Sequence, residues 1–210
     1  MPLDSPVEGL RATPPATLPF LANAHVRSFV LERPQGNVIV YNSPGLTQAA
    51  DEIRAPGEPT QLVINHCHEA MYGPPAARRA GVRARARPSR DRQRPPVSGT
   101  FTRRQMIDGG REVIPAPGHT PGASSNLWDS GAHRFLFTGD SLWVKHGDGK
   151  AVVLSSSDRA ASLDSLRLIR DLDFDVLVPW VAMTGEPFVH LVSQEDARRR
   201  IHRHRPRRSR

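Results

Sequence analysis

Residues 113–122 read VIPAPGHTPG, and residues 135–140 read FLFTGD. Each stretch opens with an apolar run typical of a buried strand and ends near a side chain that chemistry uses, His119 in the first and Asp140 in the second. The prolines and glycines on both sides of His119 predict a rigid turn, and Gly139 permits a tight turn before Asp140. We therefore expect two strand ends that each present one functional group.

Two further apolar runs end in a similar way. Residues 62–68, LVINHCH, place His66 and His68 after a run, and residues 175–180, DVLVPW, end at Trp180. In an extended segment alternate side chains point the same way, so His66 and His68 can share a ligand. Because ligands of α/β sheets gather beyond the carboxyl ends of strands, we expect these run ends to converge on one rim.

Three imidazoles and one carboxylate form a donor set typical of a metal site. These donors suit Zn²⁺, with iron or manganese as other candidates, and three protein nitrogens leave a position for water. Glu69 and Tyr72 either contact the metal ligands without binding the metal or lie in the solvated start of a helix, and we favour the second interpretation. The predicted ligands of one zinc ion are His66, His68, His119 and Asp140, with Asp140 also the predicted catalytic residue.

Length and composition indicate one folded domain. The chain has 210 residues, of which 38% are hydrophobic and 24% charged, enough for one packed core. Cys67 is the only cysteine; it excludes a cysteine-rich zinc module, and we interpret it as a small buried hydrophobe facing away from the histidines. No apolar run is long enough to cross a membrane and the start lacks a signal-peptide pattern, so we predict a cytoplasmic protein. The remaining histidines are interpreted as polar surface groups: His25, His133, His146, His190, His202 and His204.

Short apolar runs that alternate with helical patterns predict an α/β protein. Residues 29–31 and 38–41 flank a Pro-Gln-Gly-Asn turn, which predicts a β-hairpin. Residues 176–178 predict a last buried strand. Helices are predicted over residues 46–53, over 158–172 with Ser156 or Ser157 as the N-cap, and over 193–201.

The formal net charge of +8 is concentrated in two segments. Residues 73–96 hold eight arginines and one aspartate, residues 197–210 hold eight arginines and no acid, and the rest carries 13 basic and 20 acidic residues. Arg outnumbers Lys 27 to 2, which favours a GC-rich coding sequence, so we interpret both segments as frame-shifted translation. A nucleic-acid contact and a solvated loop are the alternatives, and the absence of interleaved aromatic residues argues against nucleic acid.

The same features set the expected boundaries. Residues 1–20 are rich in proline and are predicted to be an extended lead-in with little core contribution. The domain is predicted over residues 21–200, within which 73–96 lacks an apolar period and is expected to supply no core element. Residues 201–210 are predicted to form a basic tail.

The succession of motifs resembles the metallo-β-lactamase fold superfamily. GNVIVYNSPG, NHCHEA, PAPGHTPG, FLFTGD and DVLVP occur in the order and spacing typical of that family, across about residues 21–200. The resemblance implies a single-domain αββα sandwich of the metallo-β-lactamase type, with a metal site at one edge. It also implies that His66, His68 and His119 bind a first metal and that Asp140 bridges two metals.

The chain departs from the family pattern at the second metal. The family motif His-x-His-x-Asp-His ends here in Ala70 and Met71, neither of which can bind such a metal. Trp180 or one of its neighbours stands where the family has its last histidine. Only Asp140 remains of the second ligand set, so we expect one metal ion or none, rather than two.

The resemblance implies a metal-dependent hydrolase. Family members include thioesterases of the glyoxalase II type, lactonases, β-lactamases, nucleases and sulfur dioxygenases. We expect metal-bound water to attack an ester, thioester or lactone carbonyl of a small-molecule substrate, with Asp140 as the candidate base. The alternative is a catalytically inactive family member with a binding or regulatory role.

Overall fold

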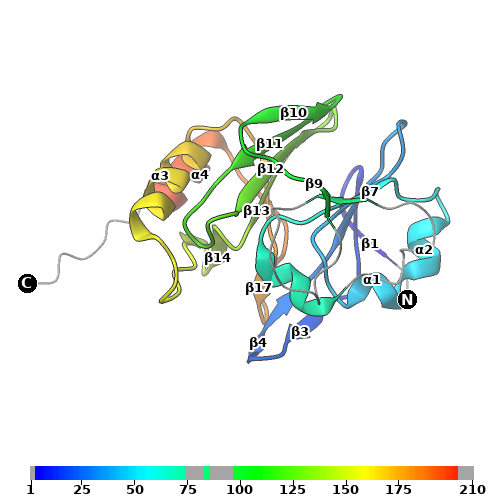
Figure 1. Ribbon diagram of the computed structural model, residues 1–210, viewed down its shortest axis with the longest axis horizontal. Helices are drawn as coiled ribbons and strands as arrows, with labels where there is room; N and C mark the ends of the chain where they lie inside the picture. The colour runs from blue at the N-terminus through cyan, green and yellow to red at the C-terminus, as the bar shows by residue number, and fades with distance from the viewer. Residues whose placement is uncertain (1–2, 74–82, 86–96, 203–210) are drawn as a thin grey trace, which may run out of the picture.

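Two β-sheets pack face to face in the computed structural model, which describes residues 3–73, 83–85 and 97–202 (Figure 1). The first sheet has seven strands in the spatial order β1 (Asp4–Val7), β2 (Leu10–Ala12), β5 (Phe29–Leu31), β6 (Val38–Val40), β7 (Gln61–Val63), β8 (Arg83–Arg85) and β9 (Val97–Gly99). The predicted hairpin is confirmed, because β5 and β6 pair antiparallel with Phe29 opposite Val40. The β-branched side chains of β6 suit a strand that is buried throughout.

The second sheet has six strands, in the spatial order β10 (Gln105–Asp108), β11 (Arg111–Pro115), β12 (Ser124–Asp129), β13 (Arg134–Gly139), β16 (Val176–Pro179) and β18 (His190–Leu191). Strands β10 to β13 form an antiparallel series. Strand β16 then joins parallel to β13, with Phe135 opposite Val176. All four residues of β16 are buried, which confirms the buried strand expected there.

Helices cover the outer face of each sheet (Figure 1). They are α1 (Gly45–Gln48) and α2 (Ala50–Arg54) on the first sheet, and α3 (Arg159–Arg170) and α4 (Gln194–His202) on the second. Leu166 and Ile169 lie on one stripe of α3 and pack in a cluster with Leu136 of β13. A separate cluster, which includes Phe29 and Phe137, fills the space between the sheets. The predicted αββα sandwich is confirmed.

Parallel strand pairs set the position of the functional edge. Strands β6 and β7 are parallel in the first sheet, and β13 and β16 are parallel in the second. Tyr41 follows β6, His66 lies beyond β7, Asp140 follows β13 and Trp180 follows β16. The Tyr41 hydroxyl accepts a hydrogen bond from Gly139 N at 2.9 Å, which brings the strand ends of the two sheets together.

The prediction that residues 1–20 form an extended lead-in with little core contribution is wrong for residues 3–20, which the structure describes. They contribute β1, β2 and β3 (Ala16–Leu18), and the side chains of Leu10 and Leu18 are buried in the core between the sheets. The prolines interrupt the strands without preventing them, because Pro6 lies in edge strand β1 and Pro19 in the turn after β3.

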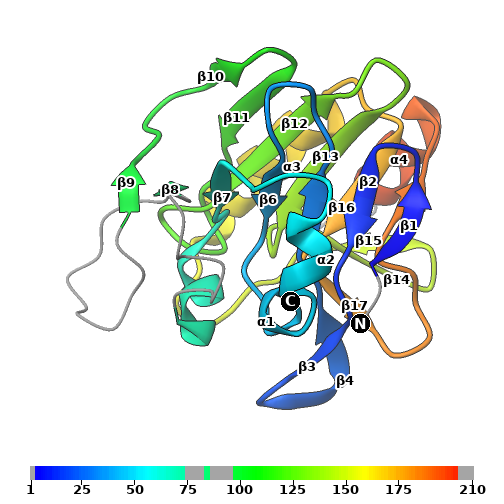
Figure 2. The same cartoon turned by 90° about the vertical axis from the view of Figure 1, so that its right-hand side faces the viewer.

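Two small sheets complete the fold. The strands β3, β4 (Leu21–Val26) and β17 (Val181–Met183) form one, and β14 (Trp143–Lys145) pairs with β15 (Asp148–Lys150) in the other. The β3–β4 hairpin projects beyond the sandwich (Figure 2). No helix among the described residues is both long and apolar enough to span a membrane.

The helices differ from the predictions at their ends. The helix expected over residues 46–53 is split into α1 and α2 at Ala49. Asp158 caps α3, rather than Ser156 or Ser157, because its carboxylate accepts a hydrogen bond from Ala161 N at 3.0 Å.

The arginine-rich segment lies largely outside the described residues. Within it, Arg83–Arg85 forms β8, which pairs parallel with both β7 and β9. The segment thus contains a paired strand that its lack of an apolar period did not predict, since strand pairing uses backbone groups. Residues 203–210 of the predicted basic tail also lie outside the described residues.

Candidate metal centre

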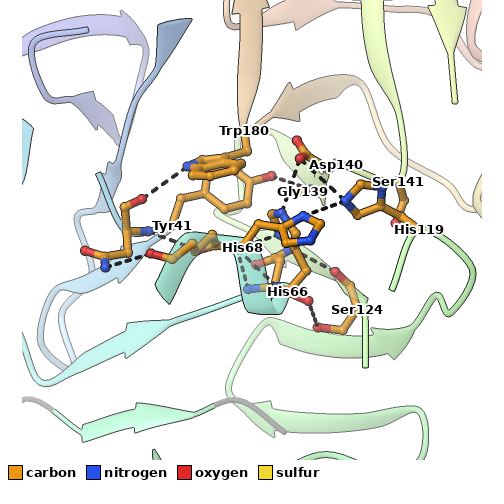
Figure 3. A network of polar contacts seen from close by, with 12 residues as sticks. Tyr41, His66, His68, His119, Ser124, Gly139, Asp140, Ser141 and Trp180 are labelled. Carbon is orange, nitrogen blue, oxygen red and sulfur yellow. Dashed lines mark hydrogen bonds and ion pairs between the residues drawn. The ribbon is translucent and has the colours of Figure 1, made fainter. Parts of the chain in front are cut away.

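The four predicted ligands meet at the functional edge (Figure 3). His66 follows β7, His68 lies in the 3₁₀ helix η1 (Cys67–Tyr72), His119 lies between β11 and β12, and Asp140 follows β13. Each offers one ligand atom, and these atoms all lie within 4.8 Å of one another. The three imidazole rings stand nearly edge to face, with centroids 4.9 to 5.3 Å apart.

The separations between the donor atoms suit a small tetrahedral ion. His119 Nε2 lies 3.0 Å from His68 Nδ1 and 3.6 Å from Asp140 Oδ2, and His66 Nε2 lies 3.3 Å from the same oxygen. A tetrahedral zinc ion with bonds of about 2.0–2.1 Å holds its ligand atoms about 3.3 Å apart. These three separations lie near that value, so the donor set is compatible with one metal ion of this size.

Glu69 holds the imidazole of His66 from behind. The Glu69 side chain is fully buried, and its Oε1 lies 3.1 Å from His66 Nδ1. The same carboxylate accepts hydrogen bonds from the backbone N–H groups of Asn42, Asn65 and His66 at 2.8 to 3.2 Å. This contact places the Nδ1 proton of His66 toward Glu69 and leaves Nε2 for a metal. The interpretation of Glu69 as a solvated helix start is wrong.

His119 is held by a different kind of partner. Its Nδ1 donates to the backbone carbonyl of Val152 at 2.9 Å, which leaves Nε2 for a metal. The Ser157 hydroxyl donates to the His119 carbonyl at 3.0 Å. Gly118, with φ of 136°, lies so close to α3 that an added Cβ would come within 2.4 Å of the Ser162 backbone nitrogen. Glycine is thus required before His119, as the motif suggested.

Two buried polar atoms of the cluster have no hydrogen-bond partner within the described ranges. They are Nε2 of His66 and Oδ1 of Asp140. The side chain of Asp140 is 12% exposed and that of His66 is 1% exposed, so water does not solvate them freely. Buried polar atoms normally find partners, so an orphaned pair at this place fits a site built for a further ligand.

The two buried histidines differ in their affinity for protons. Burial acts to lower the pKa of His66, but the carboxylates of Asp140 and Glu69 outweigh it and raise that pKa to about 10. Burial lowers the pKa of His119, whose nearest polar partner is a neutral carbonyl. Burial acts to raise the pKa of Asp140, but His66 and the other two histidines hold it below its ordinary value. Asp140 is therefore ionised at neutral pH.

The side of the cluster next to Asp140 is closed by aromatic rings. Trp180 is 1% exposed, and its ring centroid lies 5.0 Å from that of His66. Its indole N–H donates to the Asn42 carbonyl at 3.2 Å, so the indole has a structural partner. The ring of Tyr72 packs against Trp180 with centroids 6.2 Å apart. Tyr72 follows the histidine pair in η1 and is half-buried beside the cluster. The expectation that it is a solvated residue is therefore wrong.

Other expectations need correction. The chain leaves the extended conformation after His66 and enters η1, so His66 and His68 meet across a helix start and not along a strand. Cys67 is exposed, because the 3₁₀ turn directs it away from the core, and the expectation of a buried cysteine is wrong. His190 is 9% exposed and packs within β18, so it is not a surface group.

Asn65 is a positioning residue that the sequence interpretation missed. Its side-chain amide donates to the backbone carbonyls of Ser124 and Phe137 at 2.9 and 3.1 Å, and its side-chain oxygen accepts from Asn126. The end of β7 is thereby fixed to the second sheet directly before His66. The partners lie 59 to 72 residues away in the chain, and no local pattern announces such contacts.

Comparisons with solved structures show the same fold. VMB-1, determined at pH 5.5, is 17% identical over 96% of each chain, with a TM-score of 0.73. ETHE1 from Myxococcus xanthus is 15% identical over 93% of this chain and 92% of its own, with a TM-score of 0.62. The metallo-beta-lactamase FIM-1 from Pseudomonas aeruginosa, in its mono-zinc form, is 12% identical over 97% and 96% of the two chains, with a TM-score of 0.66.

Sequence comparison identifies the family of the chain but no curated relative. No curated protein matches the sequence. The family model of the metallo-beta-lactamase superfamily matches residues 50–179, a range that contains all four clustered residues. The predicted resemblance is thus confirmed. The chain belongs to the metallo-beta-lactamase superfamily.

Proposed function

We propose that this protein is a hydrolase with one zinc ion, which cleaves an ester, thioester or lactone bond in a small molecule. The observation that carries the proposal is the convergence of three imidazoles and a carboxylate within 4.8 Å. Two of the imidazoles, those of His66 and His119, are turned toward the centre because their Nδ1 atoms donate hydrogen bonds to Glu69 and to the Val152 carbonyl. Such contacts are typical of metal ligands, and the donor set also admits iron or manganese.

A single metal is favoured by the residues at the positions where the family pattern has the ligands of a second ion. Ala70 has no donor atom in its side chain, Met71 is 45% exposed, and the indole of Trp180 is already bonded to Asn42. Of the second ligand set, Asp140 alone is present at these positions. The mono-zinc form of FIM-1 supports the idea that this fold is compatible with one zinc ion.

The proposed chemistry divides between the metal and Asp140. A bound zinc ion would polarise the carbonyl and lower the pKa of water to about 7. Asp140 is ionised, its Oδ2 faces the imidazoles, and its Oδ1 has no hydrogen-bond partner in the described part of the chain. We propose that Oδ1 accepts a proton from the attacking water. His68 is half-buried whereas His66 and His119 are buried, which favours substrate entry past His68.

The test measures hydrolysis of a nitrophenyl ester, an acyl thioester and a γ-lactone by the zinc-loaded and the chelator-treated protein. We expect zinc-dependent turnover of at least one substrate. Asp140→Asn is expected to slow it by about 10²- to 10⁴-fold, the usual contribution of a general base. The control Asp164→Asn changes an exposed aspartate of α3 and should leave turnover unchanged. Turnover that persists without zinc, or in a His66→Ala, His119→Ala double variant, would contradict the proposal.

A binding or regulatory protein without catalysis is the second candidate. The observation that favours it is the buried Trp180 next to His66, because the indole supplies no ligand or base. This candidate predicts tight zinc binding with no turnover of any of the three substrate classes. Zinc binding together with turnover would exclude it.

A further inference from the structure

Tyr41 joins the two sheets beneath the metal centre. It follows β6 of the first sheet, is fully buried, and has a positive φ of 70°. Its hydroxyl donates to the Val178 carbonyl at 2.6 Å and accepts from the Gly139 N–H at 2.9 Å. Both partners belong to the second sheet, at the ends of β16 and β13 (Figure 3). A single oxygen atom thus connects three strand ends.

The position of this oxygen is set by packing. The Tyr41 ring meets Phe29 and Phe137 with centroid distances of 6.0 and 5.9 Å, nearly edge to face in both cases. These three rings belong to the core between the sheets. Burial and the carboxylates of Glu69 and Asp140 raise the pKa of Tyr41, so the phenol keeps its proton and can donate and accept at once.

The backbone of Tyr41 is held in a conformation that non-glycine residues rarely adopt. A left-handed φ at a tyrosine is unfavourable and persists only where the surroundings fix it. The conformation turns the chain so that the next residue, Asn42, donates its backbone N–H to Glu69 at 3.0 Å and offers its carbonyl to Trp180. The turn at residues 41–42 therefore contacts the Glu69 side of the centre as well as the Asp140 side.

Gly139 connects the hydrogen bond from Tyr41 to Asp140, the next residue in the chain. Its φ is 58°, and a Cβ at this position would lie 3.1 Å from the Asn65 Cβ, so the backbone here passes close to the residue before His66. The N–H that bonds to Tyr41 is one residue before Asp140. Loss of the phenol oxygen would leave a buried N–H and a buried carbonyl unpaired at the base of the Asp140 turn, and either group would then favour a rearranged backbone.

We propose that Tyr41 is a positioning residue that fixes the Asp140 carboxylate against the three histidines, and that it does so through its hydrogen bonds to Gly139 and Val178. The proposal rests on the proposed function, since it assigns Tyr41 a role in holding the metal. Tyr41 does not contact the metal or the substrate. Its effect should therefore pass entirely through Asp140.

The test is a double-mutant cycle read by metal affinity. Zinc affinity is measured by competition with a chelator, and Co²⁺ is used as a spectroscopic probe, for wild type, Tyr41→Phe, Asp140→Asn and the double variant. We expect Tyr41→Phe to weaken zinc binding about 10-fold, as loss of an outer hydrogen bond commonly does. In the Asp140→Asn background the same change should have less than about a 2-fold effect. The Co²⁺ absorption bands should shift when Tyr41→Phe is introduced into wild type. They should not shift further when the same change is added to Asp140→Asn.

A matched control separates positioning from general loosening. Ser28→Ala removes a buried hydroxyl that bonds Ser43, two residues after Tyr41, at 2.8 Å, and it should leave zinc affinity unchanged. If Tyr41→Phe fails to fold, a fluorinated tyrosine at position 41 keeps the ring and the hydroxyl but alters the strength of both hydrogen bonds, and zinc affinity should change with it.

The outcomes distinguish the two proposals. If wild type binds zinc and Tyr41→Phe binds it equally tightly, the role of Tyr41 is refuted and the proposed function stands. Equal losses from Tyr41→Phe in both backgrounds would also refute a role that acts through Asp140. If wild type binds no zinc, the proposed function fails, and the role assigned to Tyr41 fails with it.

Discussion

His66 and His119 present the same atom, Nε2, to the centre but are held by chemically different partners. A buried carboxylate, Glu69, backs His66, whereas the backbone carbonyl of Val152 backs His119. The pKa of His66 is raised to about 10 while that of His119 is lowered. We therefore expect His66 to release a proton when a metal binds, whereas His119 is expected to be neutral already.

The two partners also differ in how the chain supplies them. Glu69 lies three residues after His66, within η1, so one local turn makes both ligand and partner. Val152 belongs to a separate loop that approaches His119 from 33 residues away. The His66 contact is therefore ionic and local, and the His119 contact is neutral and depends on a loop being held in place. Each contact can be broken by itself.

Removal of Glu69 should have the largest effect. Glu69→Ala leaves the His66 imidazole and three backbone N–H groups without a buried acceptor, so we expect a loss of about 3–5 kcal/mol in the free energy of unfolding. Zinc binding should weaken by about 10- to 100-fold. Urea unfolding and chelator competition measure these quantities, and Glu69→Gln should show smaller changes in the same direction.

The control for Glu69 is Glu58→Ala. Glu58 forms an exposed ion pair with Arg54, and its removal should change stability by less than about 1 kcal/mol. Zinc affinity that is unchanged in both Glu69→Ala and Glu69→Gln would show that the carboxylate does not orient His66.

Gly118→Ala should have the second-largest effect, and it acts on the turn that holds His119. The added methyl group would meet the backbone of Ser162 at 2.4 Å, and the φ of 136° is unfavourable for alanine, so we expect a loss of about 2–3 kcal/mol. Gly131 is the matched control, because it has a φ of 90° and no atom within 4 Å of an added Cβ. Gly131→Ala should cost about 1 kcal/mol and leave zinc affinity unchanged. Equal effects of the two substitutions would contradict the close fit at Gly118.

The pH dependence should reveal the proton on His66. At pH 7 a zinc ion must displace about one proton from His66, so zinc affinity should rise about 10-fold per pH unit as pH increases toward 10. The raised pKa also stabilises the metal-free fold below about pH 6.5, and this contribution is lost as pH rises through about 10. Calorimetry in buffers of different ionisation enthalpy counts the released protons. A count near zero at pH 7 would show that His66 is neutral before zinc binds.

Ser157→Ala should have the smallest effect. The hydroxyl connects Leu154 N and the His119 carbonyl, and its loss is expected to cost about 1 kcal/mol and to weaken zinc binding a few-fold. Ser130, which closes a remote turn through similar contacts to Ala132 and His133, is the control. Ser130→Ala should cost as much stability and leave zinc binding unchanged. An identical zinc affinity in Ser157→Ala would show that the loop is held by other contacts.

The sequence predicted the parts of the site that depend on residues adjacent in the chain. His119 lies in a turn whose prolines and glycines are adjacent in the chain, and Asp140 follows an apolar run and a glycine, so their positions at strand ends could be inferred. The sandwich could be inferred from the order of such runs. The 3₁₀ turn at His66 could not, since the i, i+2 histidine spacing suits an extended chain equally well.

The parts that the sequence did not predict depend on distant partners. Glu69 is buried because Asn42, 27 residues away, supplies one of its donors, and Tyr41 matters because of Val178, 137 residues away. Neither residue carries a local signal of its partner. The strands within residues 1–20 were also missed, because prolines between short strands look the same as prolines in an extended segment.

The most direct test of the account is the number of zinc ions per chain in wild type and in the His66→Ala, His119→Ala double variant, measured by mass spectrometry after dialysis against dilute zinc. The account predicts one tightly bound zinc ion in wild type and none in the variant. Two zinc ions in wild type would contradict the single site inferred from Ala70, Met71 and Trp180. No zinc in wild type, or equal zinc in both proteins, would contradict the assignment of the clustered histidines as metal ligands.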